Sequence, residues 1–221
     1  LAGPVLLVAN HVSVLDPPLI GGMSRRALSF LAKEELFKIP LLGWLIRHLN
    51  ARPVRRDNAD PRALKDALKV LHAGEALLVF PEGTKGTSKN YSERYRLRRF
   101  GRGGFVEIAM RAGVPIVPIA VVGAEESMPI VFKVPQLAKA LGVPYVPVTA
   151  NMLLLGPLLG GIGYFPAKFK LRVLDPITFD VPPDQPRYSR SRVMEEAEDI
   201  RQTIQESLYE MLSRRQSVWR G

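Results

Sequence analysis

Short apolar runs alternate with stretches of helical periodicity along most of the chain. Apolar runs of about four to eight residues that are rich in Val, Ile and Leu are typical of buried strands. They predict strands at 4–9, 27–32, 51–55, 76–80, 115–121 and 168–174. Helical patterns occur at 17–23, 41–49, 60–73, 104–112 and 192–214. Strands that alternate with helices in this way indicate an α/β fold with a mixed, mostly parallel sheet flanked by helices.

The last helical pattern is amphipathic, and acidic residues gather in its first turns, where the helix dipole favours negative charge. The segment before it, 178–191, is polar and rich in proline, as connectors often are. We therefore expect an α/β domain over 1–177, followed over 178–221 by a connector and a C-terminal helix that packs on the same domain. The apolar positions of that helix are Val193, Ala197, Ile200, Ile204, Leu208 and Met211.

Composition narrows the classes of function. The chain has a formal charge of +10, which indicates an anionic partner such as a membrane surface, a phosphorylated substrate or nucleic acid. It has no cysteine, so disulfides, thiolate metal sites and a cysteine nucleophile are excluded within it. The chain begins with Leu1 and opens directly on a strand-like run, so we expect a fragment that lacks upstream residues.

The longest apolar run, MLLLGPLLGGIGYF, occupies residues 152–165. A helix that spans a membrane needs roughly 20 residues, so this run is too short to cross one. We interpret it either as an interfacial segment or as part of the core. Its glycines and Pro157 argue against one regular helix.

The first predicted strand ends beside a histidine, with an aspartate five residues further on. Asp16 precedes Pro17 and could simply be the N-cap of the following helix. Alternatively, the turn folds back, and the Asp16 carboxylate accepts a hydrogen bond from His11 and leaves the other ring nitrogen as a general base. The carboxyl edge of a parallel sheet, where His11 would lie, is where α/β proteins build their sites.

A second candidate loop follows the strand at 76–80, in the sequence Phe80-Pro81-Glu82-Gly83-Thr84-Lys85. A turn that combines glycine, a carboxylate, a hydroxyl and a cation is typical of a substrate-binding loop, although a polar turn with a solvated lysine has the same composition. Between the two loops, the strand at 51–55 runs into Arg55 and Arg56, whose guanidinium groups are suited to phosphate.

The segment 85–104, KGTSKNYSERYRLRRFGRGG, is strongly basic and is interleaved with aromatic residues. Its arginines Arg98, Arg99 and Arg102 are candidate contacts for the phosphates of an acyl donor or of a membrane lipid. Glycines around Arg102 precede a predicted helix, whose N-terminus favours anions. Single-stranded nucleic acid suits such a pattern as well, but we expect no nucleic-acid partner. A solvated loop is the plain alternative.

Other sequence signals are negative. The chain has no G-x-S-x-G, no Walker-type G-x4-G-K-[ST], no G-x-G-x-x-G and no H-E-x-x-H. Serine hydrolases, P-loop NTPases, dinucleotide enzymes and zinc proteases therefore lose their best sequence support. His48 and His72 lie near the ends of predicted helices, where we expect surface or capping positions.

Four blocks in order resemble those of the glycerolipid acyltransferase family, which includes the lysophosphatidic acid acyltransferases. The resemblance covers residues 4–175 and implies a fold like that of the glycerol-3-phosphate acyltransferases. It implies an O-acyltransferase of phospholipid synthesis, with acyl-CoA or acyl carrier protein as cosubstrate and 1-acylglycerol 3-phosphate as the expected acceptor. The blocks are Asn10-His11 with Asp16, the strand that leads to Arg56, Phe80–Lys85, and VPIVPIAV at 114–121.

The resemblance also assigns roles to individual residues. His11 would be the general base and Asp16 would orient it, and the acceptor hydroxyl would attack the thioester directly, without a metal or another cofactor. Arg56 and Lys85 would neutralise the acceptor phosphate. The remaining expected substrate-binding residues are Asn10, Glu82, Gly83 and Thr84.

Departures from the family pattern leave the acceptor open. The third block commonly ends in arginine, where this chain has Lys85, and the second block usually starts with glycine, where this chain has Asn50. Another lipid alcohol, such as mono- or diacylglycerol, is therefore an alternative acceptor. A non-catalytic basic module that binds anionic lipid or nucleic acid is a third interpretation. The segment 85–104 resembles a feature of a bacterial subgroup, and we expect a peripheral or monotopic protein on the cytoplasmic face of a membrane.

Overall fold

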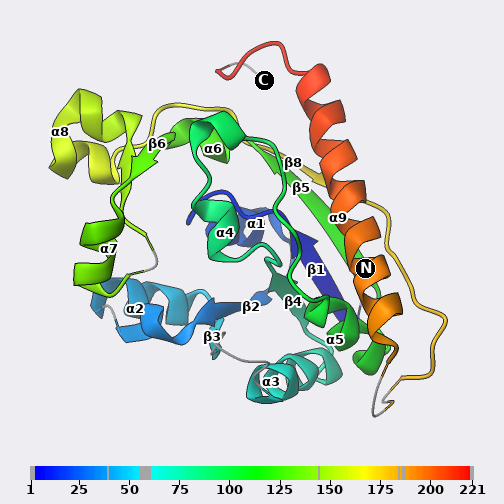
Figure 1. Ribbon diagram of the computed structural model, residues 1–221. Helices are drawn as coiled ribbons and strands as arrows, with labels where there is room; N and C mark the ends of the chain where they lie inside the picture. Colours follow the sequence, from blue (N-terminus) through cyan, green and yellow to red (C-terminus); the bar gives the residue numbers. More distant parts are fainter. Residues whose placement is uncertain are drawn as a thin grey trace.

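A six-stranded sheet organises the described residues of the computed structural model, which are 3–38, 40–54, 61–143, 145–183, 185 and 188–219 (Figure 1). Its order is β3-β2-β4-β1-β5-β8. Neighbours are parallel except that β8 runs antiparallel to β5, so the predicted mixed, mostly parallel sheet and its strands are confirmed. The strands are β1 (Val5–Ala9), β2 (Leu28–Lys33), β3 (Ala51–Val54), β4 (Ala76–Val79), β5 (Ile116–Val122) and β8 (Lys170–Val173).

Strand β1 lies at the centre of the sheet, between β4 and β5. Its side chains alternate between two core clusters, with Leu6 and Val8 on one face and Val5 and Ala9 on the other. A parallel strand that is covered on both faces reads as a continuous apolar run, which is why Val5–Ala9 shows no polar alternation.

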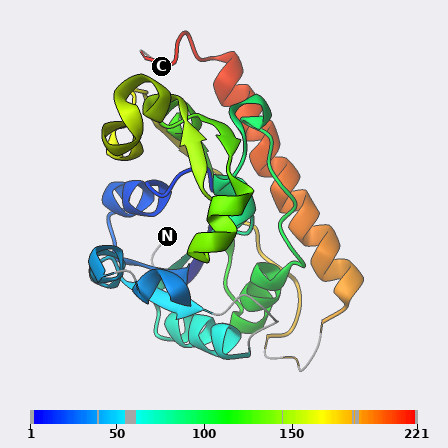
Figure 2. The same ribbon diagram turned by 60° about the vertical axis from the view of Figure 1, so that its left-hand side comes forward.

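Helices cover both faces of this sheet, and the predicted helices are confirmed with shifts of one or two residues at some ends (Figures 1 and 2). One face carries α3 (Pro61–His72), α5 (Gly104–Ala112) and α9 (Arg190–Ser213). The other face carries α1 (Asp16–Met23) and α2 (Pro40–His48), next to the 3-10 helix η1 (Glu34–Lys38). All six apolar positions predicted for the last helix are buried in the core that α9 shares with β5 and α5.

Several elements were not predicted. Strands β6 (Ile130–Lys133) and β7 (Pro147–Thr149) form a small antiparallel sheet, and α7 (Pro135–Leu141) lies between them in the chain. Three short elements follow strand ends or lie in the basic segment: α4 (Thr84–Thr87), η2 (Tyr91–Glu93) and α6 (Ala124–Ser127).

The apolar run at 152–165 forms most of a helix, α8 (Ala150–Ile162). The helix is kinked at Gly156, which has φ of 78° and precedes Pro157, so the expected irregularity is confirmed. All five of its leucines are exposed, so the interpretation of the run as core is wrong. No helix in the described ranges is both long enough and apolar enough to cross a bilayer.

The packing of α9 on the sheet can be tested with two substitutions in the same helix. Ile204 is fully buried, and Ile204→Ala should lower the free energy of unfolding by about 2–5 kcal/mol, since it removes core contacts and leaves a cavity. Tyr209 is 52% exposed, so Tyr209→Ala should change it by less than about 0.5 kcal/mol. Urea denaturation measures both. Equal losses in the two variants would contradict this packing.

Candidate active site

The candidate site lies at the carboxyl edge of the sheet, where the parallel strands end side by side. Strand β1 leads into Asn10 and His11, and its neighbour β4 leads into Phe80 and Glu82. On the other side of β1, β5 leads into α6. Neighbouring parallel strands end at the same edge, which brings these separate parts of the sequence together.

Asp16 and His11 form a hydrogen-bonded pair across the turn between β1 and α1. The Asp16 Oδ2 atom lies 3.0 Å from Nδ1 of His11, and it also accepts the backbone N–H groups of Val12 at 2.7 Å and Ser13 at 2.8 Å. Helix α1 begins at Asp16 and its N-cap position is Leu15, so the prediction of Asp16 as the N-cap is wrong. The carboxylate folds back over the turn instead, as the alternative interpretation required.

This geometry fixes the chemistry of the imidazole. A carboxylate oxygen only accepts hydrogen bonds, so the Nδ1 of a neutral His11 carries the proton and Nε2 keeps its lone pair. The ring also stacks on Phe80, with 4.4 Å between the centroids and an angle of 27° between the planes. Asp16 is fully buried, whereas the His11 side chain is 18% exposed. His11 is therefore oriented by fixed partners and still reachable from outside.

Glu82 connects the loop after β4 to two other segments. Its Oε1 accepts the backbone N–H of His11 at 3.1 Å, and its Oε2 accepts the backbone N–H of Arg98 at 2.7 Å. The Glu82 side chain is buried, and the Lys89 Nζ lies 3.9 Å from its Oε2. We expected Glu82 to bind substrate, but the structure gives both carboxylate oxygens partners within the protein.

The first turn of α4 packs directly against the backbone of His11. A Cβ atom at Gly86 would lie 2.1 Å from the His11 carbonyl oxygen, so only glycine fits there. Gly83 has φ of 57°, a left-handed conformation that favours glycine and lets the chain turn into α4. Thr84 and Lys85 follow with exposed side chains. Sequence analysis assigned no role to Gly86, although its place directly after Lys85 in the same loop was a signal.

Asn10 joins β1 to β5. Its side-chain amide donates to the carbonyl oxygen of Val121 at 3.0 Å and its Oδ1 accepts the Val121 N–H at 2.8 Å. Asn10 is 1% exposed, so the structure gives this expected substrate-binding side chain a partner in the sheet. The amide continues the pairing of the two strands beyond the end of β1.

A buried ion pair anchors the basic segment 85–104. The Lys89 Nζ lies 2.9 Å from Glu125 Oε1 at the start of α6 and donates to the carbonyl oxygen of Arg96 at 3.1 Å. Glu125 also accepts the backbone N–H of Tyr95 at 2.7 Å. Burial raises the pKa of Glu125, and the positive charge of Lys89 opposes that rise. Sequence analysis missed the role of Lys89, because a buried lysine and a solvated one look alike in a basic run.

The basic segment forms one wall of a pocket of about 540 Å³ beside the loop after β4. Three cations line it, Lys85, Arg99 and Arg102, together with Thr84 and Glu82. Arg98 does not line it, because the Arg98 side chain pairs with Glu93. The expected phosphate ligand Arg56 lies outside the described residues. In the described part of the chain, no three histidine or carboxylate side chains form a group that could hold a metal ion.

A second pocket, of about 400 Å³, is mainly apolar and lies on the face of the sheet that α1 covers. Ile20 and Met23 of α1 line it with Leu7 of β1 and Val117 of β5. The helix that places Asp16 beside His11 therefore also forms a wall of an apolar pocket.

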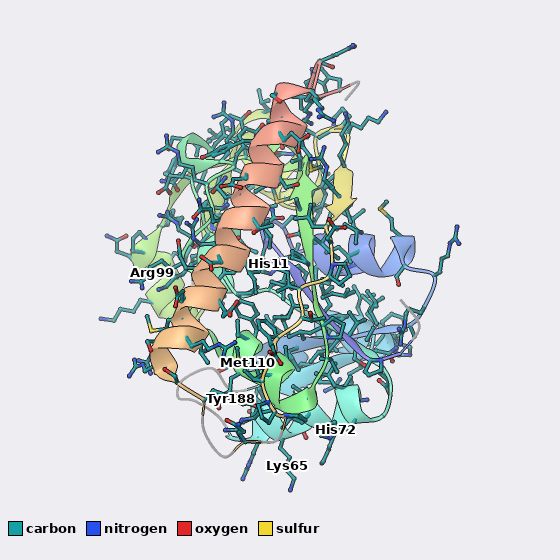
Figure 3. The ribbon with its side chains drawn as sticks, turned by 90° about the vertical axis from the view of Figure 1, so that its right-hand side faces the viewer. His11, Lys65, His72, Arg99, Met110 and Tyr188 are labelled. Carbon is teal, nitrogen blue, oxygen red and sulfur yellow. The ribbon has the colours of Figure 1, made fainter. Side chains whose placement is uncertain are left out.

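Tyr164, just after α8, is close enough to the site to sense the charge of Asp16. Burial, and then the negative charge of Asp16, raise the pKa of Tyr164 above its usual range. Figure 3 places His11 near the middle of the molecule and Arg99 beside α9, whereas Lys65 and His72 lie at the lower end.

Comparisons with known proteins identify relatives of this chain. A chain of Mycobacterium tuberculosis (strain ATCC 25618 / H37Rv), described as an uncharacterized protein, is 36% identical over 99% of this chain. This chain spans 61% of the length of that relative. The lyso-ornithine lipid O-acyltransferase of Pseudomonas aeruginosa is 38% identical over 57% of this chain and 46% of its own length.

A solved structure supports the same relationship. The 1-acyl-sn-glycerophosphate (LPA) acyltransferase, PlsC, from Thermotoga maritima aligns with a TM-score of 0.61 and 26% identity. The alignment covers 97% of this chain and 68% of that one. The model of the family described as Acyltransferase matches residues 1–122, a range that contains His11, Asp16 and the loop after β4. The chain therefore belongs to the Acyltransferase family.

Proposed function

We propose that this protein transfers a fatty acyl group from a thioester of coenzyme A or acyl carrier protein to a hydroxyl of a lysophospholipid, with 1-acylglycerol 3-phosphate as the acceptor. The observation that carries the proposal is the His11–Asp16 pair at the carboxyl edge of the sheet, with the Nε2 of His11 unused by Asp16. Membership of the Acyltransferase family and the resemblance to the T. maritima enzyme support it.

The proposed mechanism needs one base and no covalent enzyme intermediate. The Nε2 of His11 takes the proton of the acceptor hydroxyl while its oxygen attacks the thioester carbonyl carbon. Asp16 stabilises the imidazolium that forms. The carbon–sulfur bond then breaks, and the leaving thiolate receives the proton from His11. The products are an ester and a free thiol, so the base returns to its starting state without a metal or another cofactor.

The pockets supply binding sites for the other parts of the substrates. Lys85, Arg99 and Arg102 would hold the acceptor phosphate. Arg56, which lies outside the described residues, is expected from the sequence to bind the same phosphate. The apolar pocket beside α1 would take part of an acyl chain. A net charge of +10 suits an anionic membrane surface, so we place the protein peripherally or monotopically on the cytoplasmic face of a membrane.

A second acceptor class remains a candidate for a specific reason. Lys85 is a point charge and lacks the two-pronged geometry with which arginine binds phosphate, so an acceptor without phosphate is compatible with this site. The P. aeruginosa relative acylates a lyso-ornithine lipid by its name, so that lipid belongs in the same test. Mono- and diacylglycerol complete the panel.

The first test is direct detection of the acylated product by mass spectrometry. Wild-type protein with long-chain acyl-CoA or acyl carrier protein should convert 1-acylglycerol 3-phosphate in preference to the other acceptors. His11→Ala should lower the rate by at least about 100-fold, because the general base is lost. His72→Ala is the matched control, since His72 is exposed at the end of α3, and it should keep the wild-type rate. Equal rates for wild type and His11→Ala would remove His11 from the mechanism.

Substitution of Asp16 tests whether His11 depends on its hydrogen bond to Asp16. Asp16→Asn keeps the size of the side chain but removes its charge, so it no longer stabilises the imidazolium. We expect kcat to fall roughly 100- to 10,000-fold with little change in KM, which steady-state kinetics separates. A circular dichroism spectrum and melting temperature like those of the wild type would show that the fold is intact. A rise in KM alone would mean that Asp16 acts in binding.

The phosphate pocket predicts a change that depends on the acceptor. Arg102→Gln should raise KM for 1-acylglycerol 3-phosphate by about 10- to 150-fold, since a charged contact to phosphate contributes about 1.5–3 kcal/mol. KM for monoacylglycerol should stay within about twofold, because that acceptor has no phosphate to lose a contact with. Lys65→Gln on α3 removes the same charge away from His11 and should change neither value. Equal rises for both acceptors would show that Arg102 does not bind the phosphate.

A further inference from the structure

The segment around α8 has no charged side chain over an unusual length. From residue 140 to residue 167 the sequence contains no Asp, Glu, Lys, Arg or His, although charged residues make up 24% of the chain. Lysines bound the segment at both ends, with Lys139 before it and Lys168 and Lys170 after it. Within it, residues 152–162 of α8 are all apolar or glycine or proline. The helix therefore has no polar face along this stretch.

This helix is nevertheless on the surface. The exposed fraction is 73% for Leu154, 80% for Leu158 and 74% for Ile162. Figures 1 and 2 show α8 at an outer corner of the molecule, away from α9. A helix that is apolar all round is normally buried in protein or in lipid. The leucines and isoleucine of α8 that are more than half exposed are Leu153, Leu154, Leu155, Leu158, Leu159 and Ile162.

The two halves of α8 are held in a fixed shape. Gly160 in the second half lies against the first, because a Cβ atom there would be 2.2 Å from the carbonyl oxygen of Asn151. The buried Asn151 amide donates to the carbonyl oxygens of Ser127 and Gly163, which ties the base of this folded helix to α6. The exposed leucines are therefore presented by a packed and anchored unit and not by a loose end.

The character of the surface favours lipid over protein. Protein interfaces are enriched in aromatic residues and arginine and carry a polar rim, whereas the large hydrophobic side chains that α8 exposes are all leucine or isoleucine. Interfacial membrane segments combine apolar side chains with flanking lysines that reach anionic headgroups, and Lys139, Lys168 and Lys170 have those places.

We propose that α8 is a membrane-inserting wedge, whose leucines enter the acyl-chain region of a bilayer while the flanking lysines lie among the headgroups. The inference rests on the proposed function in one respect: an enzyme that acylates a lipid has to reach the membrane in which that lipid lies. The Asn151 amide binds the carbonyl oxygen of Ser127 in α6, which follows β5 at the carboxyl edge of the sheet, so α8 is attached at the same edge as His11. Insertion of α8 would thus place the His11 edge of the sheet at the surface from which lipid substrates come.

A single labelled cysteine tests insertion without any turnover. The sequence has no cysteine, so Leu158→Cys can be labelled uniquely with an environment-sensitive fluorophore. On phosphatidylcholine vesicles with phosphatidylglycerol, the label should shift to shorter wavelength and be quenched by bromine on the lipid acyl chains. Tyr209→Cys on α9 is the matched control, because Tyr209 is 52% exposed on another element away from α8 and should report water. A label at 158 that stays in water while the protein is bound would overturn the proposal.

Vesicle binding of glutamine variants measures the contribution of the leucines. Leu158→Gln should lower the partition coefficient about tenfold, and Leu154→Gln with Leu158→Gln about 100-fold, since each removes one leucine from lipid contact. Tyr209→Gln on α9, the matched control, should bind as the wild type does. The difference should persist on pure phosphatidylcholine at high salt, where headgroup attraction is screened.

The proposal for α8 and the proposed function can be contradicted by different results. Binding that is unchanged in the double variant would overturn the wedge. A concentration-dependent dimer of the wild type in sedimentation, abolished by the same substitutions, would assign α8 to contact between copies of the chain. If the wild type makes no acylated product with any acceptor, the proposed function fails, but the label and the partition coefficients still decide whether α8 inserts.

Discussion

The peptide of His11 is held from both sides by the loop that follows the neighbouring strand. Its N–H binds the Glu82 carboxylate, and its carbonyl oxygen is covered by Gly86 at a distance that no side chain would allow. Because β1 and β4 are paired in parallel register, the two loops start side by side and a few residues suffice to join them. The Asp16 hydrogen bond and the Phe80 stack then act on a backbone whose position is already determined.

The basic segment 85–104 is held by the same residue, Glu82. The Arg98 N–H binds the second oxygen of Glu82, and the buried Lys89 binds Glu125 at the start of α6. Burial of charged groups costs desolvation energy, which these paired contacts offset. Because these contacts hold the segment in place, Arg99 and Arg102 line the pocket from a backbone of fixed position and not from a solvated loop. The basic pocket that Lys85, Arg99 and Arg102 line and the backbone of His11 are thus connected through one carboxylate, that of Glu82.

Much of this arrangement could be predicted from local patterns. The strands follow from apolar runs, and the proximity of His11 to Glu82 follows from the rule that parallel strands end at one edge. The contacts that sequence analysis missed are long-range: Asn10 pairs with Val121, and Lys89 reaches Glu125. Asp16 had two locally reasonable places, and its hydrogen bonds to His11, Val12 and Ser13 show which of them it takes. For α8, the glycines and Pro157 predicted the kink. Whether its leucines are buried depends on which other elements pack against them, and composition does not specify that.

The orientation of the imidazole restricts the path of an incoming alcohol. One ring face is covered by Phe80 and the Nδ1 edge by Asp16, so the lone pair of Nε2 points along a single direction in the plane of the ring. An acceptor that anchors its headgroup in the basic pocket can bring to that line only a hydroxyl at the right separation from the anchor. Under the proposed function, the choice between the hydroxyls of one glycerol therefore depends on the distance and direction from the basic pocket to Nε2 of His11. The contacts of Glu82 with the backbone of His11 and Arg98 set both.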